Sequence, residues 1–516
     1  MGAGTMGAGI AQIACRAGIE TILHDPLPDA LERGAERVRV GLAREAERGR
    51  LGEEEAAVAR KRLRAVPSLE ELAPCELVIE AAPERLELKR ELFGRLSEVC
   101  DASAVLATNT SSIPVTSLAG AAARPESVVG MHFFNPAPVM RLLEVIAATE
   151  TAERALELAR ATGEAMGKRV ILASDGPGFL VNRCGRPFGA EALRLLGERV
   201  ATHEQIDRIC RLGGGFRMGP FELMDLVGVD VGYEVAKSFY ELSFGEPRWK
   251  PSPIQARMVA AGRHGRKAGR GYYTYTGGTH RPDDGEPPAA GGGDGRIVAL
   301  EGGGPLAREL RDLARAAGFD AREPEALSGA EPELVVDAAV PAPAADLGVL
   351  PQGPPLLAVC ADRSLAARGA PKACGFHLMP PLEATKLAEL TRLPSTPPET
   401  VEAAERFFAS LGLHTEWVGD APGLVLGRIV GQLVNEAAFA IGEGVGSAED
   451  VDAGMTLGLN HPRGPVEWSS AAGVDHVLAT IDGLYAERHE ERYRAAPLLR
   501  RAAALGVGFA SPAPGR

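Results

Sequence analysis

The sequence carries the same series of landmarks twice, and this repeat constrains the fold more than any other feature. The string MHFFNP, followed by RLLEVI, DGPGFLVNR and RMGPFE, has counterparts in FHLMPP, KLAELT, DAPGLVLGR and PRGPVE. One constant interval separates the paired residues: His132 and His377, Glu144 and Glu389, Asn182 and Gly427, Pro220 and Pro465. Four matches at one interval are hard to obtain by chance, and such a repeat means that one structural unit occurs twice.

The two copies are separated by a segment of low complexity. Residues 277–295, GGTHRPDDGEPPAAGGGDG, are almost entirely glycine, proline, aspartate and other small residues. Such a composition cannot bury enough apolar surface to order the segment by itself. We therefore predict a flexible linker over 277–295.

Each copy has an α/β part followed by a helical part. In the first part, short β-branched runs such as ETILHD, ELVIEAA and SVVGMHFF alternate with amphipathic stretches, which is typical of βαβ units around a parallel sheet. The charged stretch 30–66, which the second copy lacks, has apolar residues at helical spacing and a polar break, and it predicts a helical hairpin.

The predicted fold class is a Rossmann-type α/β domain plus an all-α domain, with the pair duplicated in tandem and the second copy degenerate. The predicted domains are, in chain order, 1–172 (Rossmann-type), 173–276 (helical), 296–415 (degenerate Rossmann-like) and 416–510 (second helical).

Composition and charge exclude several classes of protein. The 516-residue chain has a formal net charge of −13, so it lacks the basic surface that holds a nucleic-acid backbone. No apolar run approaches the roughly 18 residues of a membrane-spanning helix, and no signal-peptide pattern opens the chain. The seven cysteines form no CxxC pair, which predicts neither disulfides nor a metal site. We expect a cytoplasmic protein with no nucleic-acid or membrane partner.

The chain opens with a glycine-rich turn that runs into a helical pattern. Its spacing, Gly2-x-Gly4-x-x-Gly7, lets the backbone approach a pyrophosphate at a helix N-terminus. Asp25 ends the apolar run ETILHD, about where an acid accepts hydrogen bonds from an adenosine ribose, and its charge would repel a 2′-phosphate. The pattern predicts a dinucleotide site that favours NAD over NADP. The competing interpretation is that Asp25 merely ends a strand before Pro26.

A Rossmann-type sheet has a strand immediately before its glycine-rich turn. In the second copy RIVALE (296–301) stands before Gly302, whereas in the first copy Met1 directly precedes Gly2. Either the start codon is assigned too late or the domain folds without a central strand, and the first interpretation is favoured because this strand supports the phosphate loop. We expect the chain to be poorly stable and to bind NAD weakly until about six apolar residues are restored.

Further motifs resemble those of one enzyme family. They are VIEAAPERLELK (78–89), ATNTSSIPVTSLA (107–119), GMHFFNPAPVMRLLEVI (130–146), DGPGFLVNR (175–183), MGPFELMDLVG (218–228) and GRKAGRGYYTY (265–275). With the opening turn, this highly specific set resembles the 3-hydroxyacyl-CoA dehydrogenase family over nearly all of residues 1–276. The resemblance implies NAD-dependent oxidation of a (3S)-3-hydroxyacyl-CoA to a 3-oxoacyl-CoA.

The resemblance also implies catalytic roles for four residues. Oxidation of a secondary alcohol requires a base, and His132 is implied as that base, with Glu144 holding its other ring nitrogen. Ser111 and Asn182 are implied as hydrogen-bond donors to the 3-oxygen. Each residue alone has a plainer interpretation: a core histidine, a surface pair of Glu144 with Arg141, or a serine in a turn or helix cap. Their joint occurrence at family spacing favours the catalytic interpretation.

The remaining implied site residues bind the cofactor and the CoA moiety. For NAD they are Gly2, Gly4, Thr5, Met6, Gly7, Asp25, Glu84, Lys89, Asn109 and Asn135. For the CoA phosphates the candidates are Arg44 and Arg48 of the helical hairpin, which carries no fixed motif.

The second copy keeps the histidine and the glutamate but not their neighbours. The changed positions are Asp362 for Ser111, Gly427 for Asn182, Pro380 for Asn135 and Ala307 for Gly7. Because the oxygen clamp is lost and Asp362 would repel a developing alkoxide, we expect a structural role and no second active site. In single-copy relatives the helical domain forms dimers, so the second copy is predicted to replace a homodimer partner, with further oligomerisation left open.

Two other functions stay open on the sequence alone. One is NAD-dependent oxidation of a free hydroxy acid, which would have no need of a CoA-binding hairpin. The other is a catalytically impaired protein that binds acyl-CoA or a nucleotide. For the dehydrogenase, long tandem members resemble enzymes of short-chain acyl-CoA and aromatic-acid catabolism, such as β-oxidation and phenylacetate degradation. The candidate substrates are therefore 3-hydroxybutyryl-CoA and 3-hydroxyadipyl-CoA.

Overall fold

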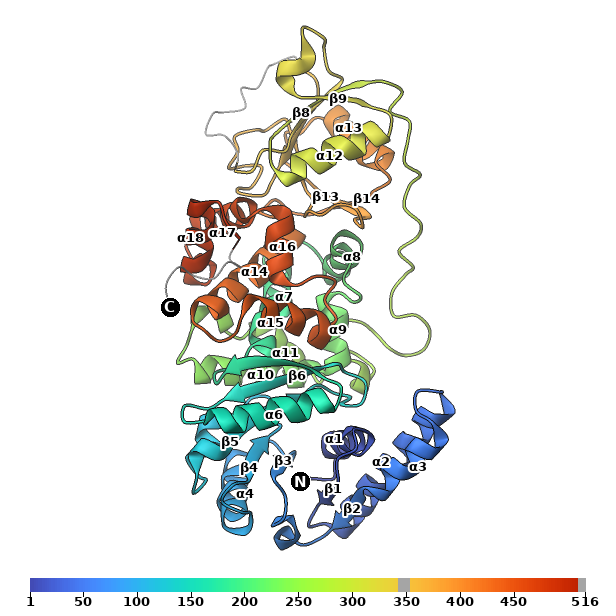
Figure 1. The fold of residues 1–516 in the computed structure, drawn as a ribbon. Coiled ribbons are helices and arrows are strands. Elements are labelled where there is room, and N and C mark those ends of the chain that lie inside the picture. The colour runs from blue at the N-terminus through green and yellow to red at the C-terminus, as the bar shows by residue number, and fades with distance from the viewer. Residues whose placement is uncertain (342–352, 509–516) are drawn as a thin grey trace. The chain divides into compact units, whose positions relative to one another are not determined.

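The chain folds as two compact units in the computed structural model, which describes residues 1–341 and 353–508 (Figure 1). Unit 1 comprises Met1–Arg183 and Glu443–Leu459, and unit 2 comprises Cys184–Gly442 and Asn460–Arg516. Residues 342–352 and 509–510 of the predicted domains lie outside the described residues. A parallel α/β sheet with helices and a separate set of packed helices are present, which confirms the predicted fold class of a Rossmann-type and a helical domain.

Unit 1 contains a five-stranded sheet in the order β3-β4-β5-β6-β7, in which β5 and β6 are antiparallel and the other pairs are parallel. Its strands are β3 (Leu77–Glu80), β4 (Val105–Thr108), β5 (Val128–Phe133), β6 (Leu142–Ala147) and β7 (Arg169–Ser174), and the helices that accompany them are α4 (Leu86–Val99), α5 (Val115–Ala119) and α6 (Glu153–Ala165). The apolar runs in β5 and β6 are buried on both faces, as expected for central strands.

The charged stretch that the second copy lacks forms the predicted helical hairpin. Helices α2 (Pro28–Glu47) and α3 (Glu53–Lys61) are separated by the polar break. The side chain of Glu55 accepts a hydrogen bond from the backbone N–H of Gly52 at 2.9 Å, which caps the N-terminus of α3. Apolar residues of α2 such as Val38 and Leu42 are fully buried in a cluster shared with α1 (Thr5–Arg16). This prediction is confirmed.

The first residues of the chain contact two separate sheets. Strands β1 (Thr21–His24) and β2 (Leu63–Val66) form a two-stranded parallel sheet of their own. Gly2 donates a backbone hydrogen bond to His24, while Met1 bonds to Ile79 and Ala81 at the end of β3. Among the described residues of unit 1, no strand occupies the position that β8 has in the continuous sheet of unit 2.

The sheet of unit 2 has seven strands in the order β14-β13-β12-β11-β10-β8-β9, with one antiparallel pair, β12 and β13. The strands are β8 (Ile297–Glu301), β9 (Asp320–Arg322), β10 (Leu334–Asp337), β11 (Leu356–Val359), β12 (Cys374–His377), β13 (Leu387–Arg392) and β14 (His414–Trp417), accompanied by α12 (Pro305–Ala316) and α13 (Pro398–Ser410). Strands β10 to β14 repeat the pairing directions of β3 to β7, as the sequence repeat predicts.

Two groups of helices in unit 2 pack together. The first group continues α7 (Val181–Gly197) and includes α8 (His203–Gly214), α9 (Pro220–Val227), α10 (Val229–Leu242) and α11 (Pro253–Ala260). The second includes α14 (Leu426–Gly442), α16 (Pro465–Ala472), α17 (Val474–Arg488) and α18 (Pro497–Leu505). Arg428 of α14 is fully buried and pairs with Glu191 of α7 at 2.6 Å, and Arg248 pairs with Glu436 of α14 at 2.6 Å. Buried ion pairs therefore join the two groups.

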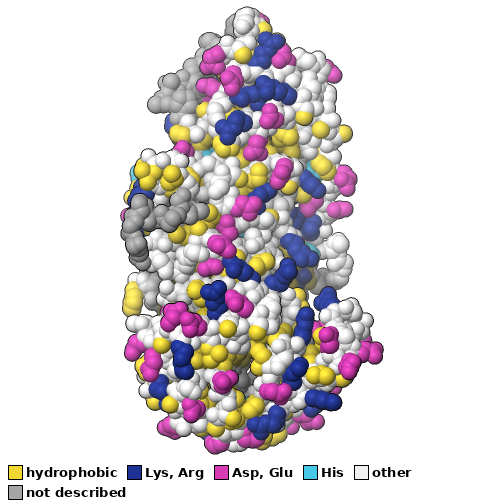
Figure 2. Space-filling view, in the orientation of Figure 1, with side chains coloured by type: hydrophobic (Ala, Val, Ile, Leu, Met, Phe, Trp, Pro, Cys, Tyr) yellow, Lys and Arg dark blue, Asp and Glu magenta, His cyan; other side chains and the backbone are white. Residues whose placement is uncertain are grey.

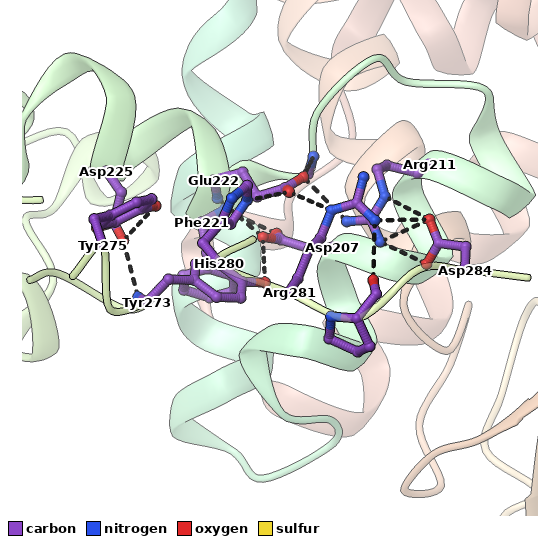
Figure 3. A network of polar contacts seen from close by, with 12 residues as sticks. Asp207, Arg211, Phe221, Glu222, Asp225, Tyr273, Tyr275, His280, Arg281 and Asp284 are labelled. Atoms are coloured by element: carbon purple, nitrogen blue, oxygen red, sulfur yellow. Dashed lines mark hydrogen bonds and ion pairs between the residues drawn. The ribbon is translucent and has the colours of Figure 1, made fainter. Parts of the chain in front are cut away.

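The predicted linker has no helix or strand, but it is anchored. His280 and Arg281 contact the buried carboxylate of Glu222 on α9, at 2.9 and 2.7 Å, and Arg211 of α8 binds Asp284 at 2.8 Å (Figure 3). The flexible linker stays a prediction, and these contacts show that residues 280–284 have partners on α8 and α9. Its few charged residues form ion pairs with partly buried side chains of the first helical group. The low apolar content of the segment does not indicate these ion pairs.

Candidate active site

A histidine and a glutamate meet across the antiparallel strands β5 and β6. His132 and Glu144 lie directly opposite each other in the strand register, so their side chains share one face of the sheet. The Nδ1 of His132 is 2.7 Å from a carboxylate oxygen of Glu144. His132 is 6% exposed and Glu144 is fully buried, which excludes the alternative of a surface pair between Glu144 and Arg141. The rings of Phe134 and Phe179 border the imidazole.

The second oxygen of Glu144 is held by the start of α7. The backbone N–H groups of Leu180 and Val181 donate hydrogen bonds to it at 3.1 and 2.9 Å. Donors at a helix N-terminus stabilise a carboxylate in its charged form. Asn182, which is partly buried, follows directly as the second residue of α7. One carboxylate thus connects His132 to the segment that carries Asn182.

Ser111 is exposed on the loop after β4, and Glu84 holds the backbone of this loop. One oxygen of the Glu84 carboxylate accepts hydrogen bonds from the N–H groups of Ser111 and Ser112, at 3.1 and 3.2 Å, and from the hydroxyl of Thr110. Its other oxygen is 3.3 Å from the Nζ of Lys89. Glu84 and Lys89 are expected beside the cofactor on the family resemblance; their contacts in the structure set the conformation that presents Ser111.

Glu80 completes this polar group, and sequence reasoning missed it. It is fully buried at the end of β3, where its carboxylate accepts hydrogen bonds from Lys89 at 2.7 Å and from the Thr108 hydroxyl at 2.8 Å. Burial acts to raise the pKa of Glu84, but Lys89 and the loop hydrogen bonds outweigh it and hold that pKa below its usual value. The available signal was a glutamate inside the apolar run ELVIEAA, because a charge in such a place needs a buried partner.

Asn109 connects the Ser111 loop to the strand that carries the histidine. Its side-chain oxygen accepts a hydrogen bond from the backbone N–H of Phe133 at 2.8 Å. Its own N–H donates to the carbonyl of Glu80 at 2.7 Å. Asn135 is exposed just beyond Phe133. Both asparagines lie where the parallel strands β3, β4 and β5 end, which is the edge where ligands bind to sheets of this type.

The glycine-rich turn has the tight geometry that its spacing predicts. A Cβ added at Gly7 would lie 1.8 Å from the carbonyl oxygen of Gly2, so a larger residue does not fit at the start of α1. The carboxylate of Asp25, just after β1, accepts a hydrogen bond from the backbone N–H of Ala3 at 2.9 Å. Asp25 therefore does more than end a strand: it fixes the turn at a helix N-terminus that suits a pyrophosphate.

The other sequence-predicted contact residues lie at or near the surface of unit 1. Gly4 and Thr5 are exposed at the N-terminus of α1, and Met6 is partly buried. Arg44 and Arg48 are exposed at the C-terminal end of α2, where they are free to meet an anionic group in solvent.

The visible surface shows Lys and Arg side chains interspersed with Asp and Glu, with no single-sign field (Figure 2). Within residues 1–341 and 353–508, none of the helices has the length and hydropathy needed to span a lipid bilayer. Over the same ranges, no group of three or more His, Cys, Asp or Glu side chains is arranged to hold a metal ion.

The second copy holds the corresponding pair in a different state. His377 lies opposite Glu389 in the same antiparallel register, but its Nδ1 is 3.9 Å from the carboxylate and has no hydrogen-bond partner among the described residues. Glu389 accepts hydrogen bonds from the N–H groups of Val425 and Leu426, at 2.7 and 3.1 Å. Burial lowers the pKa of His377 well below its usual value and raises that of Glu389 to about 8. Both groups are therefore neutral near pH 7.

Two neighbours close the space around His377. A Cβ added at Gly427 would lie 2.5 Å from the Cε1 of His377, so the asparagine of the first copy does not fit there. The Nε2 of His476 on α17 lies 3.4 Å from the Nε2 of His377. Asp362, in the position of Ser111, is nearly buried and contacts Arg363 at 3.3 Å. These contacts support the prediction that the second copy has a structural role.

The chain matches known protein domains over most of its length. The NAD-binding domain of 3-hydroxyacyl-CoA dehydrogenase matches residues 1–176. The C-terminal domain of 3-hydroxyacyl-CoA dehydrogenase matches residues 178–275 and, a second time, residues 423–511. These matched ranges cover far more than half of the chain, and the second match falls on the helices of the second copy.

Individual proteins show the same similarity. The chain is 35% identical to a 3-hydroxyadipyl-CoA dehydrogenase of Escherichia coli, over 99% of this chain and 98% of that protein. It is 40% identical to a probable 3-hydroxybutyryl-CoA dehydrogenase of Bacillus subtilis, over 53% of this chain and 95% of that protein. A crystal structure of a 3-hydroxybutyryl-CoA dehydrogenase from Escherichia coli is 33% identical, with a TM-score of 0.82, over 98% of this chain and 97% of that chain. The chain therefore belongs to the 3-hydroxyacyl-CoA dehydrogenase family and is an NAD-dependent oxidoreductase of that family.

Proposed function

We propose that this chain oxidises a (3S)-3-hydroxyacyl-CoA to the 3-oxoacyl-CoA, with His132 as the general base. The observation that carries the proposal is the 2.7 Å contact between the imidazole of His132 and the buried carboxylate of Glu144. An imidazole held by a carboxylate is oriented for proton transfer, whereas a core histidine packed only against apolar side chains is not.

Glu144 determines which nitrogen of His132 takes the proton. When Nδ1–H donates to the carboxylate, Nε2 keeps its lone pair and accepts the hydroxyl proton of the substrate. The positive charge that then forms on the imidazole is stabilised by Glu144. Because N–H groups of α7 bind its other oxygen, this carboxylate has little freedom to rotate.

Ser111 and Asn182 donate hydrogen bonds to the substrate's 3-oxygen while the alcohol becomes a carbonyl. A good donor at a developing charge contributes roughly 2–4 kcal/mol. The backbone around each residue is fixed before substrate arrives: Glu84 holds the loop of Ser111, and Glu144 holds the start of α7 next to Asn182. Little reorganisation is therefore needed in the transition state.

NAD, when bound, supplies the pyridinium carbon that takes the hydride. We assign its pyrophosphate to the turn formed by Gly2, Gly4 and Gly7, next to Thr5 and Met6. A Cβ at Gly7 would collide with the carbonyl oxygen of Gly2, and a Cβ at Gly4 would have no protein atom within 4 Å, so the turn is closed on itself at Gly7 and open at Gly4. Asp25 binds the adenosine ribose, and Asn109 and Asn135 stand at the sheet edge beside the nicotinamide. Glu84 and Lys89 also lie beside the cofactor at this edge of the sheet. The exposed Arg44 and Arg48 bind the CoA phosphates.

The second copy replaces the partner subunit of a homodimer in this proposal. Support comes from the buried pairs that join the helical groups of the two copies, Arg428 with Glu191 and Arg248 with Glu436.

A cytoplasmic location is also proposed, because none of the seven cysteines forms a disulfide.

The dependence on a thioester tests the proposed reaction. The ultraviolet absorbance of NADH is followed with acetoacetyl-CoA and, separately, with free acetoacetate. We expect NADH to be consumed with the thioester and not with the free acid. Consumption with the free acid would indicate a hydroxy-acid dehydrogenase, and consumption with neither would indicate a binding protein; each result contradicts the proposal.

A further inference from the structure

A short segment of the second copy belongs to unit 1, together with the Rossmann-type domain of the first copy. This segment, Glu443–Leu459, follows α14 and contains α15 (Ala448–Ala453) and η6 (Gly454–Gly458). The η6 element is a single turn of π-helix, a rare conformation that occurs frequently at functional sites. The contacts of this segment with the first copy therefore bear on the active site.

Polar contacts attach the segment to β7, the edge strand of the sheet in unit 1. The backbone N–H of Ser174 donates to the carbonyl of Val445 at 2.8 Å, and the Ser174 hydroxyl donates to the carbonyl of Gly444 at 3.1 Å. Arg183, which is nearly buried on α7, pairs with Glu443 at 2.7 Å. The backbone of the segment is thus fixed against the end of β7 and the start of α7.

Val181, the first residue of α7, packs against two glycines of η6. A Cβ added at Gly454 would lie 2.7 Å from the Cγ2 of Val181, and one added at Gly458 would lie 3.2 Å from its Cγ1. Val181 is fully buried, and a β-branched side chain has little freedom to rotate. A larger residue at either glycine would therefore displace Val181.

The residues that pack against η6 also contact the histidine and the glutamate. The N–H of Val181 donates to Glu144 at 2.9 Å. A Cβ added at Gly458 would lie 3.4 Å from the ring of Phe134, whose centroid is 4.6 Å from that of His132. The segment therefore contacts one neighbour of Glu144 and one neighbour of His132.

The same arrangement occurs in unit 2 with the roles of the copies exchanged. Gly213 of α8, in the first copy, is the counterpart of Gly458, and a Cβ added there would lie 3.4 Å from Leu426, the counterpart of Val181. The N–H of Leu426 likewise holds the glutamate of the second copy. Each copy thus packs against the helix start that anchors the glutamate of the other copy, so the contact is part of the duplicated architecture.

We propose that Gly454 and Gly458 of the second copy are positioning residues for the reaction in the first copy, and that the active site is incomplete without them. They act on His132 and Glu144 through the buried side chains that lie between. This inference rests on the proposed function, since it takes His132 and Glu144 as the catalytic pair. Proton transfer depends on exact placement, and a displacement of about 1 Å can cost on the order of 100-fold in rate.

Steady-state kinetics and hydrogen exchange of the full chain test this inference. Gly454→Ala places a Cβ against Val181, so kcat for oxidation of a 3-hydroxyacyl-CoA should fall by about 10- to 100-fold. The KM for NAD should change by less than about twofold, because the displaced group bears on the proton transfer. The N–H groups of Leu180 and Val181 should exchange about 10-fold faster, because their bonds to Glu144 are weakened. Gly94→Ala on α4, where the added Cβ meets an atom at an ordinary 3.5 Å, is the matched control and should change neither measurement.

Two further variants separate positioning from a loss of folding, which circular dichroism monitors. The double variant Gly454→Ala/Val181→Ala makes room for the added Cβ and should regain about threefold or more in kcat over Gly454→Ala alone. Glu443→Gln removes the charge of a half-exposed partner of Arg183, so the chain should stay folded and kcat should fall by about two- to fivefold.

Unchanged kcat in Gly454→Ala overturns the inference, and so does a fall in kcat with unchanged exchange at Leu180 and Val181. A double variant that regains no activity contradicts the route through Val181. If Gly454→Ala does not fold, unchanged kcat in Glu443→Gln decides against the inference. If the unaltered chain oxidises no hydroxyacyl thioester, the proposed function fails. The exchange measurement then decides separately whether the segment controls the start of α7, and equal exchange in both proteins contradicts it.

Discussion

The two copies keep the same histidine and glutamate on paired strands, but they differ in the distance between the two side chains and in the exposure of the histidine. In the first copy, His132 contacts Glu144 at 2.7 Å and remains slightly exposed. In the second, His377 is fully buried and lies 3.9 Å from Glu389. Because the strand register is the same in both, the difference comes from the residues around the pair.

The surrounding residues explain why His377 cannot act as a general base although Glu389 is retained. Burial makes both His377 and Glu389 neutral, so the attraction that would draw them together is lost. His476 covers the ring nitrogen that would have to receive a proton. A general base needs a partner on one nitrogen and access on the other. The second copy provides neither.

A large loss of activity is expected on substitution of Asn182, which follows the N–H groups that hold Glu144. Asn182→Ala should lower kcat/KM for the hydroxyacyl thioester by a factor that corresponds to roughly 2–4 kcal/mol, because one donor to the 3-oxygen is removed. Steady-state rates with NAD and circular dichroism of the variant check this. Activity within about threefold of the unaltered chain, which is less than 1 kcal/mol, would exclude Asn182 from the oxygen clamp.

At Gly427, the equivalent position of the second copy, an added Cβ should lower the stability of the fold. Gly427→Ala places a Cβ 2.5 Å from the imidazole of His377, so we expect a loss of about 1–3 kcal/mol in the free energy of unfolding. Gly431→Ala on the same helix is the matched control. Its added Cβ meets Ile481 at an ordinary 3.5 Å, and it should be neutral or stabilise the fold by up to about 1 kcal/mol through helix propensity. Denaturant unfolding of both variants measures the difference; equal effects would mean that the space around His377 is not closed.

An effect of similar size is expected from Glu389, which should make the stability of the fold depend on pH. Burial raises the pKa of Glu389 to about 8, so its contribution to stability is complete at pH values below its usual pKa and is lost as the pH rises toward 8. Glu389→Gln cannot ionise and should lack this slope. We expect the variant to gain on the order of 1–3 kcal/mol relative to the unaltered chain between pH 5 and pH 8. His377 and His476 titrate in the opposite sense but are present in both proteins. A pH-independent difference would show that Glu389 is ionised in the folded state.

The family resemblance, and not a local rule, implied the pairing of His132 with Glu144, and the structure brings these two side chains together. The distance of His132 from Glu144 along the chain is that of opposite residues in a hairpin of buried strands, and the repeat supplied a second instance of the same spacing. The hairpin α2–α3 followed from apolar periodicity and a polar break. The loss of Asn182 in the second copy was visible as Gly427.

Contacts between residues far apart in the sequence were not predictable. Glu84 is 27 residues from Ser111, and no sequence pattern indicates that its carboxylate binds the backbone of that loop. His476 meets His377 across 99 residues. The anchoring of Asp284 by Arg211 depends on a tertiary position that composition does not report. Each of these contacts is polar, and each is fixed by packing that brings separate elements together.

The most direct test replaces each histidine in turn and measures oxidation of a 3-hydroxyacyl-CoA by NAD. His132→Gln should lower kcat by about 10²- to 10⁴-fold, the contribution of a general base, while His377→Gln should leave kcat unchanged. Full activity in His132→Gln, or a matching loss in His377→Gln, would contradict the conclusion that the chemistry belongs to the first copy.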